Sequence, residues 1–146
     1  MSSEETPYAG FWRRWAAYIL DAVIVGYVAN SFYFFMLNQV MRQRGIDFDP
    51  HTIAHIYHNI LTVILAWAYF AGMESSPLRA TLGKAAVGLF VTDLNGDRIS
   101  FGQATGRFFG KIVSSLILCI GFMMAGWTSR KQALHDQMAG TLVLRK

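Results

Sequence analysis

An arginine and an aspartate lie seven residues apart in the apolar stretch FWRRWAAYILDAVIVGYVAN, residues 11–30. On an α-helix, Arg14 and Asp21 share one face and lie about 10 Å apart along the axis, too far for a direct ion pair unless the arginine reaches inward. A carboxylate near the middle of a bilayer costs about 2.5–3.5 kcal/mol, so Asp21 needs a partner or a function. Either it is a protonatable or cation-binding group, or it pins a neighbouring helix through backbone N–H groups and an arginine.

Three histidines form a second pattern, HTIAHIYH, in which His51, His55 and His58 are spaced by four and three residues. On a helix they share one face, which suits a metal ion, with Asp47 or Asp49 as a further oxygen ligand. Isolated histidines near a membrane interface are the common alternative. They are therefore weak candidates, and no metal site is predicted.

The sequence shows no pattern for catalysis. It holds no Ser/His/Asp or Cys/His nucleophile set, and TLGKAAVG lacks the upstream glycine of a phosphate-binding loop. We therefore expect a protein that is not an enzyme, and the residues indicate no cofactor.

The composition places these residues in a membrane. Hydrophobic residues make up 53% of the 146-residue chain, and they fall in blocks. This pattern favours an integral membrane protein over a soluble domain. The net charge of +4 comes from basic residues that flank the apolar blocks, so the expected partner is membrane lipid rather than nucleic acid.

The apolar blocks predict one membrane α-helical domain over residues 1–146. Two secure transmembrane helices are expected over residues 15–37 and 60–73, the second extended back to about residue 53. A third apolar helical region over residues 112–127 is 16 residues long, near the lower limit for one span. It is either a re-entrant or bent hairpin or a third crossing.

Two β-rich segments bear on that choice. A small β-hairpin is expected around Asn95-Gly96, and a C-terminal strand over residues 141–146. They can pair only if both lie on the same side of the membrane. A third crossing would also divide the basic residues almost evenly between the two sides, so we favour the re-entrant hairpin, with the N-terminus in the cytoplasm.

Small residues form a stripe on the helix expected to begin after Ser100. Gly102, Gly106 and Gly110 recur every four residues, which lets another helix approach closely and predicts self-association as a homo-oligomer. The alternative is that these glycines only weaken the helix.

Three segments, in order along almost the whole chain from residue 8 to 145, resemble the RDD family of small bacterial membrane proteins: YAGFWRRWAAYILD, ESSPLRATLGKAAVGLFVTDLNGDRISFGQA and RKQALHDQMAGTLVLRK. The family is named for one arginine and two aspartates. The resemblance matches them to Arg14, Asp21 and Asp136, with Arg13 and Asp93 as alternatives for the arginine and the second aspartate. It implies a multi-pass protein of the bacterial inner membrane that is suspected of transporting some ligand, and no known catalytic reaction.

A polar cluster is therefore at the centre of the functional hypothesis. Asp136 is expected to contact Arg14 or Arg107, and Glu74 to cap the next helix or join the cluster; Arg107 and Lys111 are otherwise anchors for lipid phosphates. We expect a small transporter, or an ion- or proton-coupled permease component, in which the cluster handles a proton, a small cation or a substrate. The alternative is a non-transporting membrane scaffold whose cluster only holds the helices together. The full predicted cluster comprises Arg14, Asp21, Asp136, Glu74 and Arg107.

Overall fold

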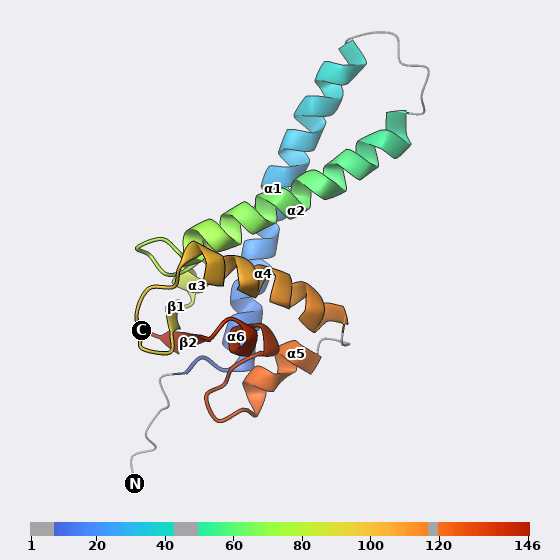
Figure 1. Cartoon of the computed structure of the whole chain (residues 1–146). Helices are drawn as coiled ribbons and strands as arrows, with labels where there is room; N and C mark the ends of the chain where they lie inside the picture. The colour runs from blue at the N-terminus through green and yellow to red at the C-terminus, as the bar shows by residue number, and fades with distance from the viewer. Residues whose placement is uncertain (1–7, 43–49, 117–119) are drawn as a thin grey trace.

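The computed structural model describes residues 8–42, 50–116 and 120–146, and two long helices form a hairpin at its start (Figure 1). α1 runs over Phe11–Arg42 and α2 over Pro50–Glu74. At about 1.5 Å per residue both exceed the roughly 30 Å of a hydrocarbon core. Both are long and apolar enough to cross a membrane, so the two predicted spans are confirmed as candidate transmembrane helices.

The helical hairpin buries little of its apolar surface within the chain. Only 11% of the apolar window of each helix is buried. On α1, the rings of Tyr27, Phe34 and Phe35 are all exposed. Water would disfavour so much apolar surface, whereas lipid tails would cover it. The exposure therefore agrees with a membrane location for the hairpin.

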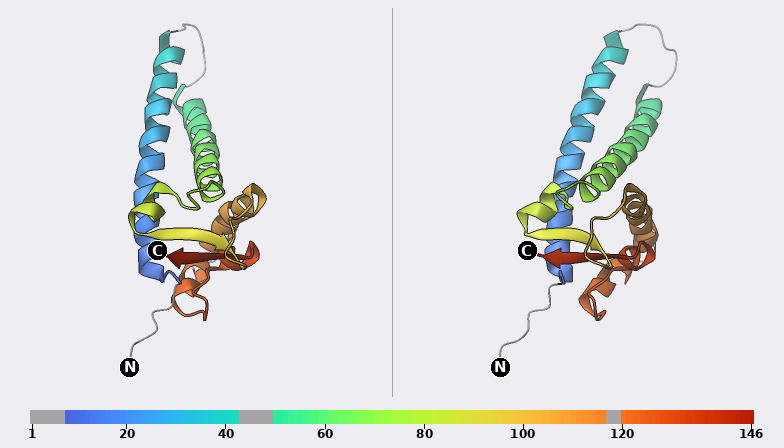
Figure 2. Two further views of the ribbon diagram at one scale, coloured as in Figure 1. Left: turned by 90° about the vertical axis from the view of Figure 1, so that its left-hand side faces the viewer. Right: turned by 60° about the vertical axis from the view of Figure 1, so that its left-hand side comes forward.

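Two short strands lie beside the lower end of α1 (Figure 2). β1 (Leu89–Asp93) and β2 (Thr141–Arg145) pair antiparallel, with Val91 opposite Val143. The backbone just before α1 joins them, since the N–H of Ala9 donates to the carbonyl oxygen of Val143 at 2.9 Å. The start of α1 and both strands thus share one small apolar core.

The predicted β-hairpin differs from the structure because its second arm is not a strand. Residues 97–100 have no regular structure, and they follow a turn at Asn95-Gly96. In that turn, Oδ1 of Asp93 accepts hydrogen bonds from the N–H groups of Asn95 and Asp97, both at 2.8 Å. Gly96 has a φ of +90°, which glycine adopts without strain. β1 instead takes the predicted C-terminal strand as its partner.

The described residues of the third apolar region belong to three helical elements. α4 covers Phe101–Leu116, α5 Ile120–Met123 and the 3₁₀ helix η1 Met124–Gly126. α4 begins at Ser100, whose Oγ accepts from the N–H of Gln103 at 3.2 Å. Because β1 and β2 pair with each other, the chain leaves the sheet after β1 and returns to the same sheet at β2.

Two five-residue helices complete the described fold. α3 (Leu82–Ala86) packs against α1, and α6 (Leu134–Met138) packs against α4. Thr81 caps the first turn of α3. α6 does not extend back to Lys131, because Lys131 has a φ of +47°, which an α-helix does not accommodate.

The glycine stripe of α4 is only partly used within the chain. Gly110 is buried against α6, where an added Cβ would lie 2.9 Å from Cβ of His135. Gly102 and Gly106 are exposed, and among the described residues no other helix comes within 4 Å of a Cβ added at either position. As an intrachain contact, the predicted close packing therefore occurs at Gly110 and not at Gly102 or Gly106. The face that meets α6 is the one that also carries Arg107.

Candidate functional site

Four charged side chains from four helices form a buried ion-pair network. Arg14 of α1 pairs with Oδ2 of Asp136 in α6. Nη1 of Arg107 in α4 lies 2.9 Å from Oδ1 of Asp136, and its Nε lies 3.0 Å from Oε2 of Glu74 at the end of α2. Neither of these Arg107 contacts is aligned as a hydrogen bond, so the attraction is mainly electrostatic. The network ties the short elements to the lower end of the helical hairpin.

Two lysines join the network at Glu74. Nζ of Lys84, from α3, lies 2.5 Å from Oε1 of Glu74. Nζ of Lys111, one turn after Arg107, lies 3.6 Å from the same oxygen, beyond hydrogen-bond distance, and 4.1 Å from the centre of the Phe70 ring. Lys111 is therefore the most loosely held cation of the network.

In this network, burial disfavours the charged form of a side chain, and a neighbouring opposite charge favours it. Burial lowers the pKa of Lys84 to about 8, although Glu74 opposes the shift. Burial also lowers the pKa of Lys111, again against the attraction of Glu74. Burial alone would raise the pKa of Asp136, but Arg107 and Arg14 hold it well below its usual range. Removing one partner from a buried pair costs about 3–5 kcal/mol, because the other charge is left unpaired.

Asp21 lies outside this network, in hydrogen bonds of its own. Its Oδ1 accepts from the hydroxyl of Tyr69 and from the N–H of Gly83, both at 2.8 Å. Its Oδ2 accepts from the hydroxyl of Thr81 at 2.6 Å. The carboxylate is fully buried. Asp21 therefore holds the start of α3 against α1 and also ties in α2.

Arg14 does not reach Asp21, so the single cluster predicted to hold both residues is corrected to two separate sets of contacts. Nε of Arg14 donates to the carbonyl oxygen of Ala9 at 2.9 Å, and Nη2 donates to that of Lys131 at 2.6 Å. These bonds turn the guanidinium towards the start of α1 and the loop before α6. The separation of about 10 Å along the helix is left unbridged.

The other predicted site residues can now be placed. The structure brings Arg14, Glu74, Arg107 and Asp136 together in one network. The alternatives for the family's charged residues, Arg13 and Asp93, lie outside it in the described structure. Arg13 is exposed, and Asp93 holds the turn after β1.

Sequence reasoning misses four residues that position the site: Tyr69, Thr81, Gly83 and Lys84. Thr81 carries a signal, because a threonine before a short helical run is a typical N-cap. Gly83 must be glycine, since an added Cβ would lie 2.2 Å from the carbonyl oxygen of Ala17 and 2.8 Å from the Asp21 carboxylate. Tyr69 gives no signal, because an aromatic residue in an apolar span is expected to face lipid.

The histidines near the start of α2 pack differently from a metal site in the part of the chain that is described. The His58 ring lies 4.7 Å from the Tyr33 ring of α1, and the His55 ring stacks on it at 6.5 Å. The side chain of His51 lies outside the described residues. Within the described residues, no group of three or more His, Cys, Asp or Glu side chains is arranged to hold a metal ion.

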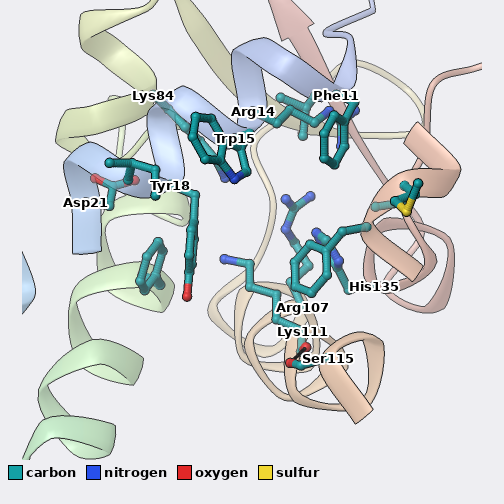
Figure 3. Close-up of a pocket in the computed structure, with 16 residues that line it drawn as sticks. Phe11, Arg14, Trp15, Tyr18, Asp21, Lys84, Arg107, Lys111, Ser115 and His135 are labelled. Carbon is teal, nitrogen blue, oxygen red and sulfur yellow. Dashed lines mark hydrogen bonds between the residues drawn. The ribbon is translucent and has the colours of Figure 1, made fainter. Parts of the chain in front are cut away.

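A cavity of about 410 Å³ opens beside the ion network (Figure 3). Figure 3 shows the amino group of Lys111 pointing into the space between Tyr18 and Arg107. The charged side chains that line the cavity are Arg14, Asp21, Lys84, Arg107 and Lys111. Much of the remaining wall is apolar and comes from α1 and α5: Phe11, Trp15, Tyr18, Ile19, Phe122 and Met123.

His135 lines the same cavity in its neutral form. Burial lowers its pKa to about 3, although Asp136 opposes the shift. Nε2 of the ring lies 3.4 Å from Oδ1 of Asp136. Within the described residues, neither that oxygen nor Nδ1 of the ring has a hydrogen-bond partner, and both atoms are buried.

The fold and the site together define a small α-helical membrane domain, in which a buried ion network fixes short elements to one end of a two-helix hairpin. The chain belongs to the RDD family, whose pattern it matches over residues 8–140. This confirms the family resemblance noted in the sequence.

The chain is similar over most of its length to two Bacillus subtilis proteins. It is 32% identical to "Uncharacterized protein YxaI", with 94% of this chain and 97% of that protein aligned. It is 28% identical to "Uncharacterized membrane protein YteJ", with 95% of this chain and 82% of that protein aligned. A "Proline-rich antigen" of Mycobacterium leprae is 30% identical over 57% of this chain and 33% of its own length. No solved structure gives a significant match.

Proposed function

We propose that this protein is a small transporter, or the membrane component of a permease, and that its ligand binds in the cavity beside the ion network. The observation that carries the proposal is the cavity itself. Its volume of about 410 Å³ is in the range of small-molecule sites, and Lys84, Arg107 and Lys111 line it together. Charged side chains that face a cavity within a membrane domain often mark substrate or ion pathways.

The ion network and Asp21 have different roles in this proposal. The loosely held Lys111 contacts the ligand. Asp21 instead holds α3, because hydrogen bonds from Tyr69, Thr81 and Gly83 already occupy its carboxylate. Coupling to a proton or a small cation remains part of the proposal, and it is assigned to the network rather than to Asp21.

The proposed protein is a multi-pass protein of the bacterial cell membrane, with its N-terminus in the cytoplasm. The pairing of β1 with β2 supports this arrangement, because the segment between them begins and ends at one sheet. The positive-inside rule then puts most basic residues in the cytoplasm. Cysteine labelling in a Cys119→Ser background tests it: labelling of residues 95 and 146 from opposite sides would reject it.

A non-transporting scaffold is the second candidate, and one observation favours it. Glu74 and Asp136 are each paired with more than one cation, so the ion network could serve packing alone. The two candidates differ in what they predict for flux across a membrane.

Reconstituted protein tests the proposal. The purified chain is placed in liposomes that contain a pH-sensitive dye, and a panel of organic anions, phosphate esters and monovalent cations is added outside. A transporter produces movement of at least one solute, or of protons driven by it, that empty liposomes lack. Absence of any such movement across the panel would leave the scaffold.

A further inference from the structure

The charges around the cavity leave one cation in excess. The network and the cavity wall contain four cations, Arg14, Lys84, Arg107 and Lys111, and three carboxylates, Asp21, Glu74 and Asp136. Arg14 pairs with Asp136, Arg107 with both Glu74 and Asp136, and Lys84 with Glu74. Lys111 shares Glu74 with both Arg107 and Lys84, 3.6 Å from an oxygen that Lys84 already contacts. An anion in the cavity beside Lys111 would balance the one positive charge in excess.

The amino group of Lys111 is open to such an anion. Its side chain is 15% exposed and points into the cavity in Figure 3, whereas the side chains of Arg107 and Asp136 are almost fully buried. A phosphate group presents several charged oxygens and suits this position.

The walls of the cavity indicate where such a ligand comes from. Trp15, Tyr18 and Ile19 line the cavity and are also exposed on α1, a candidate membrane span. Apolar walls that continue onto a lipid-facing surface can accommodate acyl chains, while the cations lie at the inner end. Basic pockets beside membrane helices bind anionic lipid head groups in this way.

We propose that the cavity binds the head group of an anionic phospholipid that enters from the bilayer, with the lipid phosphate at Lys111. This inference names the ligand class of the cavity and so rests on the proposed function.

Native mass spectrometry of the purified chain in detergent tests the inference. Phosphatidylglycerol and phosphatidylcholine are titrated against the wild type, Lys111→Gln, Lys111→Arg and Arg13→Gln. Arg13→Gln removes the same charge from an exposed position on α1 that does not line the cavity, and so controls for general attraction to anionic lipid. We expect phosphatidylglycerol to bind about tenfold more tightly than phosphatidylcholine, and Lys111→Gln alone to lose that preference.

Three further outcomes are decisive. Retained preference in Lys111→Arg supports a charge at this position, and it also shows that the fold tolerates change there. Equal binding of the two lipids by the wild type, or equal losses in Lys111→Gln and Arg13→Gln, would overturn the inference. Displacement of the lipid by soluble glycerol phosphate at similar concentrations would keep the head-group chemistry but overturn the lipid source.

Flux without lipid preference would reject only this inference, and lipid binding without flux would reject only the transport proposal.

Discussion

The backbone nitrogen of Gly83 lies 2.8 Å from Oδ1 of Asp21, 62 residues earlier in the chain. With the hydroxyl of Thr81 at 2.6 Å from Oδ2, this contact makes Asp21 a cap for the first turn of α3. An acid inside the first candidate span is thus matched by donors from a helix outside both spans. The reason for Asp21 in an apolar sequence is the docking of α3.

Replacing Asp21 with asparagine is expected to lower stability without changing flux per folded molecule. The amide group of asparagine has one acceptor oxygen, so a donor from Gly83, Tyr69 or Thr81 loses its partner. The expected loss is about 1–3 kcal/mol in the free energy of unfolding. Denaturation in detergent measures the first quantity and liposome flux the second. Normal stability with abolished flux would show instead that Asp21 takes part in transport.

Replacing Gly83 with alanine is expected to separate α3 from α1. The new Cβ would lie 2.2 Å from the carbonyl oxygen of Ala17, and backbone atoms have little room to move. The expected loss is about 3 kcal/mol or more, measured as the free energy of unfolding. Gly72→Ala is the matched control, because nothing lies within 4 Å of a Cβ added there. A similar small effect in both variants would contradict the predicted close contact.

Stability is expected to fall as pH decreases from 6.5 to 4.5, because His135 is neutral in the folded chain. Its pKa is about 3 when folded and about 6.5 when unfolded, so the unfolded state binds more protons in this range. The slope approaches about 1.4 kcal/mol per pH unit. The side chains that act on its charge are Asp136, Arg107, Lys111 and Lys84. Denaturation in detergent should show a shallower slope for His135→Gln, and an unchanged slope would refute the assignment.

Self-association is expected to use the exposed part of the glycine stripe. Gly102 and Gly106 face away from the other helices of the described chain, so a second copy could approach there. Gly106→Leu should reduce crosslinked dimer in lipid while leaving the melting temperature nearly unchanged. Gly110→Leu should instead destabilise the fold, because the new side chain would clash with His135. Monomer alone in the wild type would exclude this interface.

The sequence predicted the parts of the fold that depend on local pattern. Apolar runs of sufficient length identify α1 and α2, and the alternation and turn residues identify both strands of the sheet. It did not predict that β1 would choose the C-terminal strand over residues 97–100, because that choice depends on a core completed by Ala9 and Val143.

The candidate site shows the same limit. Arg14 and Asp21 can be identified as candidates because they are charged residues in an apolar segment. Their spacing on a helix predicts that they belong to one cluster. Their partners, however, come from elements far away in sequence: Asp136 for Arg14, and Gly83 for Asp21. Helical spacing shows which face a side chain occupies, but only the packing of α3 and α6 decides what meets it.

Flux through liposomes containing wild type, Lys111→Gln or Arg13→Gln tests the central claim most directly, that the cavity beside the ion network is the ligand site. With equal amounts of folded protein, Lys111→Gln should lose about tenfold of the solute or lipid movement shown by the wild type, and Arg13→Gln should keep it. The melting temperature of Lys111→Gln should stay close to that of the wild type, because the side chain of Lys111 makes no hydrogen bond within the described residues and Glu74 keeps Lys84 and Arg107 as partners. Equal flux in Lys111→Gln and the wild type would contradict the claim.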